Sequence, residues 1–323
     1  MYKAISKLIL LLIIPLAVNT HSGEIDQFQI KRSDDSLIDY YIQKNIADSQ
    51  TKPLSKTLLL IVQGSDCNSI VHNASINDLK AAWPEADLLL VEKYAITSAL
   101  TYSTSNGRED CPADTIKMDS LEQRVSDILE VIKVTDSTGI YDQMLVIGGS
   151  EGAVVANIVA SQTNAIDATA SFNGGGRWFL DDVLHSIKYG KANTPELKAE
   201  INGFSEMASH IVANRQMEIE VSGHGSRWWR SVLQLDQLEI LNKTKSPILI
   251  LQSEEDQSVS VINTDKMIKS LLKNGKSNIS YKKYAGLDHS FRDSSGDSKL
   301  ADVVKDINQW FLSTIEIDTS KTL

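Results

Sequence analysis

A serine flanked by glycines is the strongest chemical signal in the 323-residue chain. The run GGSEG at residues 148–152 directly follows the apolar stretch 144–147 and precedes a segment rich in small residues. A G-x-S-x-G run between a strand and a helix is typical of a nucleophile elbow, a sharp turn that exposes the serine hydroxyl. The positive end of the helix would then favour negative charge developing beside Ser150. The alternatives are an ordinary tight turn and a loop that cradles a phosphate.

His289 is the candidate for the general base that a serine hydroxyl requires. It lies in the run GLDHSF at residues 286–291, a predicted loop between the last strand and the last helix. It also follows Ser150 in the chain order serine, acid, histidine that is known for nucleophile-elbow sites. The alternative for a single histidine in such a loop is a solvated surface residue.

A carboxylate is also required, because it holds the histidine tautomer and stabilises the imidazolium. Asp256 lies a few residues after the apolar run 247–251, so a short side chain there can turn toward the histidine loop. Glu254 and Glu255 are competing candidates, and either can instead be solvated. Asp288 adjoins the histidine itself and is expected to point elsewhere.

Two backbone donors are expected to stabilise the oxyanion of an acyl-transfer reaction. The N–H of Glu151, directly after the serine, is the first. The second is expected in the loop after the apolar run 57–62, where the N–H of Ser65 is our first choice and that of Asp66 the next. The alternative for this loop is an ordinary turn that contains glycine.

The order of these residues resembles the α/β-hydrolase fold superfamily over roughly residues 24–311. Three motifs carry the resemblance: the elbow around Ser150, the D-x-x-V that begins at Asp256 and the G-x-D-H-x-F around His289. The resemblance implies a serine hydrolase that forms an acyl-enzyme and requires no metal or organic cofactor.

Two further features resemble the bacterial dienelactone hydrolase and prolyl oligopeptidase branches of that superfamily. These are the S-E-G sequence that begins at Ser150 and the pair Trp228-Trp229 before the strand that leads to the acid. The chain departs from the common pattern at Gln63, where many members have histidine, and at Ser253, where glycine often precedes the acid. Neither position supplies a side chain to the chemistry.

Alternating strand and helix patterns must position these residues. Short apolar runs bounded by turn residues suit strands that are buried on both faces. The expected strands are residues 24–30, 37–43, 57–62, 87–91, 144–147, 166–172, 247–251 and 278–281, and the expected helices are 120–134, 151–160, 261–273 and 299–311. This alternation predicts a doubly wound α/β fold with a mostly parallel sheet and the site at the carboxyl ends of its strands.

One segment, residues 177–241, breaks the alternation because it is largely helical in pattern and lacks a convincing strand. We interpret it as a helical cap inserted into a single hydrolase domain that covers residues 23–323. Trp178, Trp228 and Trp229 in this segment are candidates to line a substrate pocket, since large flat side chains suit an acyl or aromatic group. The alternative is that the tryptophan pair only packs the cap onto the core.

The first 22 residues resemble a secretory signal. Lys3 and Lys7 precede an apolar stretch of eleven residues, 8–18, which is too short for a spanning helix of about 20 residues. We therefore expect cleavage after residue 22, a secreted or periplasmic location and no stable membrane insertion afterwards. The alternative is an uncleaved anchor.

Charge and cysteine content narrow the possible partners. The net charge of −10 disfavours DNA, RNA and anionic membranes, so no nucleic-acid partner is expected. Cys67 and Cys111 are an even pair, which favours a disulfide in an exported protein over two separate thiols. Neither their spacing nor a nearby histidine supports a metal site.

Together these features predict an exported serine hydrolase that cleaves an ester, thioester or amide of a small-molecule acyl substrate. A carboxylic ester is the favoured bond. One alternative is a serine peptidase related to the prolyl oligopeptidase branch, although no propeller-length region precedes the hydrolase pattern. Another is a hydrolase-fold binding protein that has lost turnover, against which the intact serine, acid and histidine argue.

Overall fold

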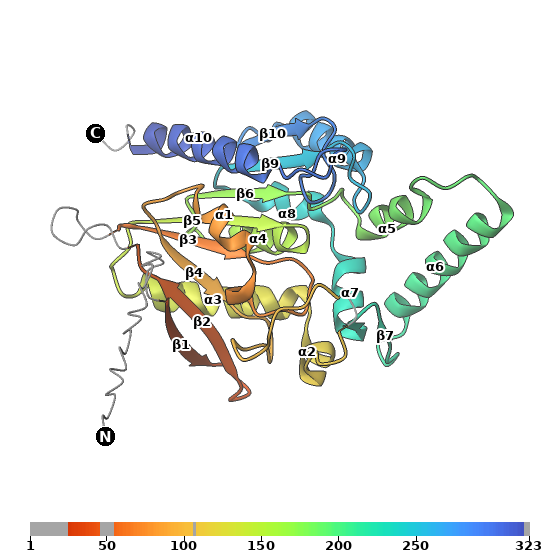
Figure 1. Cartoon of the computed structure of the whole chain (residues 1–323), viewed down its shortest axis with the longest axis horizontal. Helices are drawn as coiled ribbons and strands as arrows, with labels where there is room; N and C mark the ends of the chain where they lie inside the picture. The colour runs from red at the N-terminus through yellow and green to blue at the C-terminus, as the bar shows by residue number, and fades with distance from the viewer. Residues whose placement is uncertain (1–24, 46–54, 106–107, 320–323) are drawn as a thin grey trace, which may run out of the picture.

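An eight-stranded sheet forms the centre of the computed structural model, which describes residues 25–45, 55–105 and 108–319 (Figure 1). The strands lie in the order β1-β2-β4-β3-β5-β6-β9-β10, and only β2 runs antiparallel to its neighbours. Their bounds are β1 (Ile25–Lys31), β2 (Leu37–Gln43), β3 (Thr57–Val62), β4 (Asp87–Val91), β5 (Gln143–Gly149), β6 (Ala168–Phe172), β9 (Ile248–Ser253) and β10 (Ile279–Tyr284). The predicted doubly wound, mostly parallel α/β fold is confirmed.

Helices cover both faces of this sheet, which is why its central strands are continuously apolar. Along β3, for example, Leu58 and Leu60 face one hydrophobic core, whereas Leu59 and Ile61 face the other. Each fully buried side chain of this size contributes about 1.5–3 kcal/mol. One face is covered by α3 (Leu121–Asp136), α4 (Glu151–Gln162), α8 (Gln237–Lys243) and α9 (Val261–Lys273), and the other by α1 (Ser75–Lys80) and α10 (Leu300–Thr319).

The strand order reverses beside β3, because β4 lies on one side of it and β5 on the other. The carboxyl ends of β3 and β5 are neighbours at this point, so the loops that follow them lie beside each other. Ligands of open α/β sheets bind at such a switch point. The predicted oxyanion loop and the predicted serine elbow are these two loops.

The segment expected to form the cap contains α5 (Phe179–Lys188), α6 (Pro195–Ala213), β7 (Glu220–Val221), β8 (His224–Gly225), α7 (Ser226–Gln234) and α8. The elements from α5 to α7 lie beyond one end of the sheet (Figure 1), and we call them the cap. Two details differ from expectation. β7 and β8 pair as a two-residue ribbon, and α8 packs against α4 and α9 in the helical layer of the sheet.

A disulfide joins Cys67, in the loop after β3, to Cys111, just before α2 (Ala113–Met118). Closing a loop of this length stabilises a fold by about 2–4 kcal/mol.

Within the described ranges, no helix combines the length and the apolar character needed to cross a bilayer. The predicted signal segment, residues 1–22, lies outside those ranges and stays a prediction.

Candidate active site

Ser150 occupies a strained turn between β5 and α4. Its φ of 55° and ψ of −127° lie in a region that side-chain-bearing residues rarely adopt, at a cost of about 1–3 kcal/mol. The backbone N–H of Ser150 donates to the carbonyl of Phe172 at 2.9 Å, which ties the turn to the end of β6. The predicted strand, sharp turn and helix around this serine are therefore present.

Glycines on both sides of Ser150 allow this turn. A Cβ at Gly148 would lie 2.2 Å from the carbonyl oxygen of Gly152, and one at Gly152 would lie 2.1 Å from that of Val62. Any larger residue at these two positions would push α4 away from β3 and β5. The glycines therefore let the helix begin directly beside the sheet.

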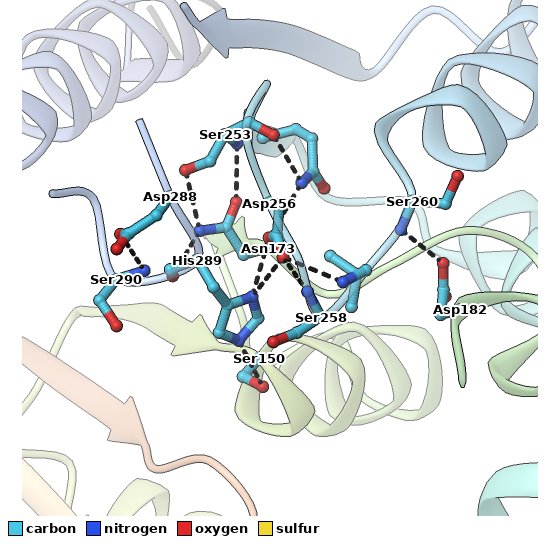
Figure 2. Close-up of polar contacts among 12 residues, drawn as sticks. Ser150, Asn173, Asp182, Ser253, Asp256, Ser258, Ser260, Asp288, His289 and Ser290 are labelled. Atoms are coloured by element: carbon cyan, nitrogen blue, oxygen red, sulfur yellow. Dashed lines mark hydrogen bonds and ion pairs between the residues drawn. The ribbon is translucent and has the colours of Figure 1, made fainter. Parts of the chain in front are cut away.

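Three side chains form a hydrogen-bonded chain at the carboxyl end of the sheet (Figure 2). The Nε2 atom of His289 lies 3.1 Å from the Oγ of Ser150, although the residues are 139 positions apart. The Nδ1 atom of His289 lies 2.8 Å from Oδ2 and 3.0 Å from Oδ1 of Asp256. Because a carboxylate only accepts, Nδ1 carries the proton and Nε2 is left to accept one from the serine.

Asp256 is held in place by its own loop. Its Oδ1 accepts from the backbone N–H groups of Ser258 at 2.8 Å and Val259 at 2.9 Å, and its Oδ2 accepts from Nε2 of Gln252 at 3.2 Å. The side chain is fully buried. These donors fix the direction of the carboxylate toward His289.

The competing carboxylates have other partners. Glu254 forms an ion pair with Lys283 at 3.1 Å, and the exposed Glu255 accepts from a tyrosine hydroxyl at 3.5 Å. Asp288 accepts from the backbone N–H of Ser290 at 2.8 Å and thereby shapes its own loop. Of the carboxylates considered, Asp256 is therefore the one that reaches the histidine.

Asn173, at the end of β6, is a site residue that the sequence did not suggest. Its Nδ2 donates to the carbonyl of His289 at 2.9 Å and to Oγ of Ser253 at 3.2 Å, while its Oδ1 accepts from the Ser253 N–H at 2.8 Å (Figure 2). It therefore fastens the histidine loop to the strand that leads to Asp256. Its place directly after an apolar run was the only available signal.

The residues expected to stabilise an oxyanion lie beside the serine. Ser65 and Glu151 line the same pocket as Ser150, and a Cβ at Gly64 would lie 3.7 Å from the serine Cβ. The backbone N–H of Asp66 was the second choice in this loop; its carboxylate accepts hydrogen bonds from Nε2 of Gln63 and from the N–H of Asn68. The loops after β3 and β5 thus meet at the nucleophile, as an oxyanion hole requires.

A largely apolar pocket of about 140 Å³ opens beside the serine. It is lined by Ser65, Leu121, Ser150, Glu151, Val154, Asn173, Gly174, Phe179, Asp182, Trp228, Val232, Leu235, Gln237 and Val259. Its wall is therefore shared between the hydrolase sheet and the cap helices α5 and α7.

The three predicted pocket tryptophans have different positions. Trp228 lines the pocket and packs edge-to-face on Phe179, with ring centroids 5.6 Å apart. Trp229 is buried behind it and donates its indole N–H to the carbonyl of Val221 at 3.2 Å. Trp178 lies at the surface, 37% exposed, with the guanidinium of Arg177 over its ring. Helix α7 thus contributes both to the pocket and to the packing of the cap.

A buried carboxylate on α5, Asp182, also lines the pocket and joins the cap to the sheet. It accepts from the backbone N–H groups of Gly176 and Ser260, each at 2.9 Å. Burial raises the pKa of Asp182 to about 6.

Across the described ranges, no cluster of three or more histidine, cysteine, aspartate or glutamate residues has a geometry that could hold a metal ion.

Residues 96–317 match the prolyl oligopeptidase family, Peptidase_S9. The chain belongs to this family. The matched region contains Ser150, Asp256 and His289, and it excludes the loop of Ser65. Prolyl oligopeptidase family members are serine hydrolases of the α/β-hydrolase superfamily, so the resemblance found in the motifs is confirmed. No curated protein sequence matches the chain.

Solved structures of esterases and peptidases share the fold. Est1E from Butyrivibrio proteoclasticus is similar at a TM-score of 0.58 and 15% identity over 90% of this chain and 99% of its own. The esterase Pf2001 from Pyrococcus furiosus has a TM-score of 0.53 and 14% identity, over 91% of this chain and 92% of its own. A puromycin-hydrolyzing peptidase from Mycobacterium tuberculosis has a TM-score of 0.60 and 14% identity, over 90% of this chain but only 39% of its own. At these identities the similarity shows the α/β-hydrolase fold alone.

The assignment of the acid leads to a first prediction. Asp256→Asn should slow covalent modification of Ser150 by a fluorophosphonate by roughly 10²- to 10⁴-fold, because an amide does not hold the Nδ1–H tautomer. Glu254→Gln is the matched control and should react at the wild-type rate. Reaction rates followed by intact-protein mass spectrometry test this. A large loss in the Glu254 variant, with none in the Asp256 variant, would reverse the assignment.

Proposed function

We propose that this family member is a carboxylic ester hydrolase that forms an acyl-enzyme on Ser150. The observation that carries the proposal is the hydrogen-bonded chain from the Ser150 hydroxyl through His289 to Asp256. A serine hydroxyl is a weak nucleophile until a base within hydrogen-bond reach takes its proton. The distance of 3.1 Å between the serine Oγ and the histidine Nε2 meets that requirement.

The reaction follows from the positions of these groups. His289 takes the proton of Ser150 as the hydroxyl oxygen attacks the ester carbonyl, and the N–H groups of Glu151 and Ser65 donate hydrogen bonds to the resulting oxyanion. The histidine then gives its proton to the departing alcohol, which leaves an acyl group on the serine. The same histidine deprotonates the water that attacks the acyl-enzyme, and it then returns this proton to Oγ of Ser150 as the carboxylic acid leaves.

A small acyl group suits the pocket. Its volume of about 140 Å³ is close to that of cavities of about 150 Å³ that hold benzene, and its lining is largely apolar. We therefore propose a short aliphatic or single-ring acyl group as the part of the substrate that is retained on the serine. Leu235 and Trp228 of the lining would contact this group.

A serine peptidase is the second candidate, because the family that the chain belongs to is named for an oligopeptidase and one structural neighbour is a puromycin-hydrolyzing peptidase. The ester hydrolase is favoured by Est1E and the esterase Pf2001, since this chain matches 99% and 92% of their lengths. Turnover of peptidyl anilides as fast as that of aryl esters would decide for the peptidase.

We further propose that the protein acts outside the cytoplasm. The disulfide between Cys67 and Cys111 supports this proposal, because such bonds persist in oxidising compartments. The signal-like segment at residues 1–22 is the second support. Fractionation of cells that express the full chain would test the location.

Ester turnover should depend on Ser150. Wild-type protein is expected to hydrolyse p-nitrophenyl butyrate and, when quenched during turnover, to carry one butyryl group on this serine. Ser150→Ala should reduce hydrolysis to the rate without enzyme, because the nucleophile is absent. Absorbance at the nitrophenolate band and peptide mass spectrometry measure the two effects. Turnover by the alanine variant, or acylation of another residue, would reject the proposal.

Acyl-group size should matter because the pocket is closed by the cap. Among p-nitrophenyl acetate, butyrate, benzoate and decanoate, we expect the decanoate to have a kcat/KM at least about tenfold below that of the best substrate. A methylene group that a hydrophobic pocket does not accommodate changes the activation free energy by about 1–3 kcal/mol. Leu235→Ala should relax this limit, whereas Leu233→Ala should not, because Leu233 packs against the same core but does not line the pocket. Equal effects of the two substitutions would show that the pocket does not hold the acyl group.

A further inference from the structure

A buried cation connects the two loops that meet at Ser150. One terminal nitrogen of Arg124, on α3, donates to the carbonyl of Gln63 at 2.7 Å, at the end of β3. The other donates to the carboxylate of Glu151, at the start of α4. Arg124 and Glu151 are both almost fully buried. A single guanidinium therefore fixes the spacing between the loop after β3 and the nucleophile elbow.

Glu151 is suited to this connection because both of its carboxylate oxygens are used. Oε1 accepts from Arg124, and Oε2 accepts from the indole N–H of Trp228 at 2.6 Å. Burial opposes ionisation of this carboxyl, but the charges of Arg124 and Lys93 outweigh it and lower the pKa of Glu151. The residue whose backbone N–H is proposed as an oxyanion donor is thus anchored by its own side chain.

The loop after β3 is held from its other end as well. The ammonium of Lys93 donates to the carbonyl of Asp66, and Nε2 of Gln63 donates to the Asp66 carboxylate at 2.6 Å and to the carbonyl of Asn68 at 2.8 Å. Ser65, the second proposed donor, lies between Gln63 and Asp66. The segment that carries its N–H is therefore restrained at both ends by buried groups.

We infer that Arg124 is a positioning residue for the oxyanion hole, where it sets the separation of the Ser65 and Glu151 N–H groups. It acts through Gln63 and Glu151 and does not itself contact the reacting atoms. The inference rests on the proposed acyl-enzyme function. A guanidinium suits this task because its planar fork donates in two fixed directions, which one ammonium does not reproduce.

Arg124→Lys keeps the charge but removes the two-directional fork. Oxyanion contacts form in the transition state, so we expect kcat for p-nitrophenyl butyrate to fall by roughly 10- to 100-fold while KM changes less than about threefold. The affinity for a trifluoromethyl ketone, which mimics the tetrahedral intermediate, should fall by the same factor as kcat. If Arg124 had only a structural role, the substitution would lower the melting temperature, but kcat and ketone affinity would not fall by the same factor.

The same helix supplies a matched control. Arg32 forms a buried ion pair with Asp127 of α3 at 2.8 Å, with both side chains less than a tenth exposed, one turn away from Arg124. Arg32→Lys makes the same chemical change in a second buried pair that lies outside the oxyanion loops. It should destabilise the fold to a similar degree and leave kcat and ketone affinity unchanged.

Glu151→Gln, with Asp127→Asn as its control, provides a second pair if the lysine variant of Arg124 does not fold. Glutamine keeps the shape and one acceptor but removes the charge that holds Arg124, so kcat should again fall with little change in KM. The inference is overturned if folded Arg124→Lys and Glu151→Gln keep the wild-type kcat and ketone affinity. It is also overturned if the control variants Arg32→Lys and Asp127→Asn lose as much kcat and ketone affinity as the variants of Arg124 and Glu151. Failure of the proposed function would appear in the wild type as absent acylation of Ser150 and would overturn both claims.

Discussion

The site depends on the close approach of α4 to strands β3 and β5. A single methyl group at Gly152 would lie 2.1 Å from the carbonyl oxygen of Val62, so a side chain there would force the helix outward. The local costs are about 1–3 kcal/mol for the strained turn at Ser150 and about 1 kcal/mol for a glycine in a helix. Burial of Val155 and Val159 on α4, at about 1.5–3 kcal/mol each, offsets these costs and holds the turn in its strained form.

Electrostatic interactions stabilise the site in two places, at Asp256 and beneath the elbow. Asp256 is buried but accepts three hydrogen bonds besides the one from His289, so its charge is satisfied where the reaction needs it. Beneath the elbow, the ion pair of Arg124 and Glu151 is buried as well. Buried pairs add little net stability but are costly to break. Their value here is geometric, because they connect α3, both loops of the site and, through Trp228, the cap.

Much of this arrangement followed from the sequence, for identifiable reasons. Strands buried on both faces read as continuous apolar runs, and a glycine-flanked serine after such a run has few alternatives. The acid was harder, because Glu254, Glu255 and Asp256 are adjacent and only the turn after β9 decides which one faces His289. Asn173, Arg124 and Asp182 were missed because their roles depend on partners far away in the chain. Tryptophans 228 and 229 are neighbours in sequence but lie on different faces of α7, so only the first reaches the pocket.

In the proposed mechanism, a strained elbow and a buried ion pair place two backbone N–H groups around one oxygen atom. The crystal structure of the protein after reaction with a short-chain alkyl fluorophosphonate tests it most directly, because the adduct mimics the tetrahedral intermediate. We expect phosphorus bonded to Ser150 Oγ, with its oxygen about 2.7–3.1 Å from the backbone nitrogens of Ser65 and Glu151. A phosphoryl oxygen that points into solvent, or that is held by other groups, would contradict it.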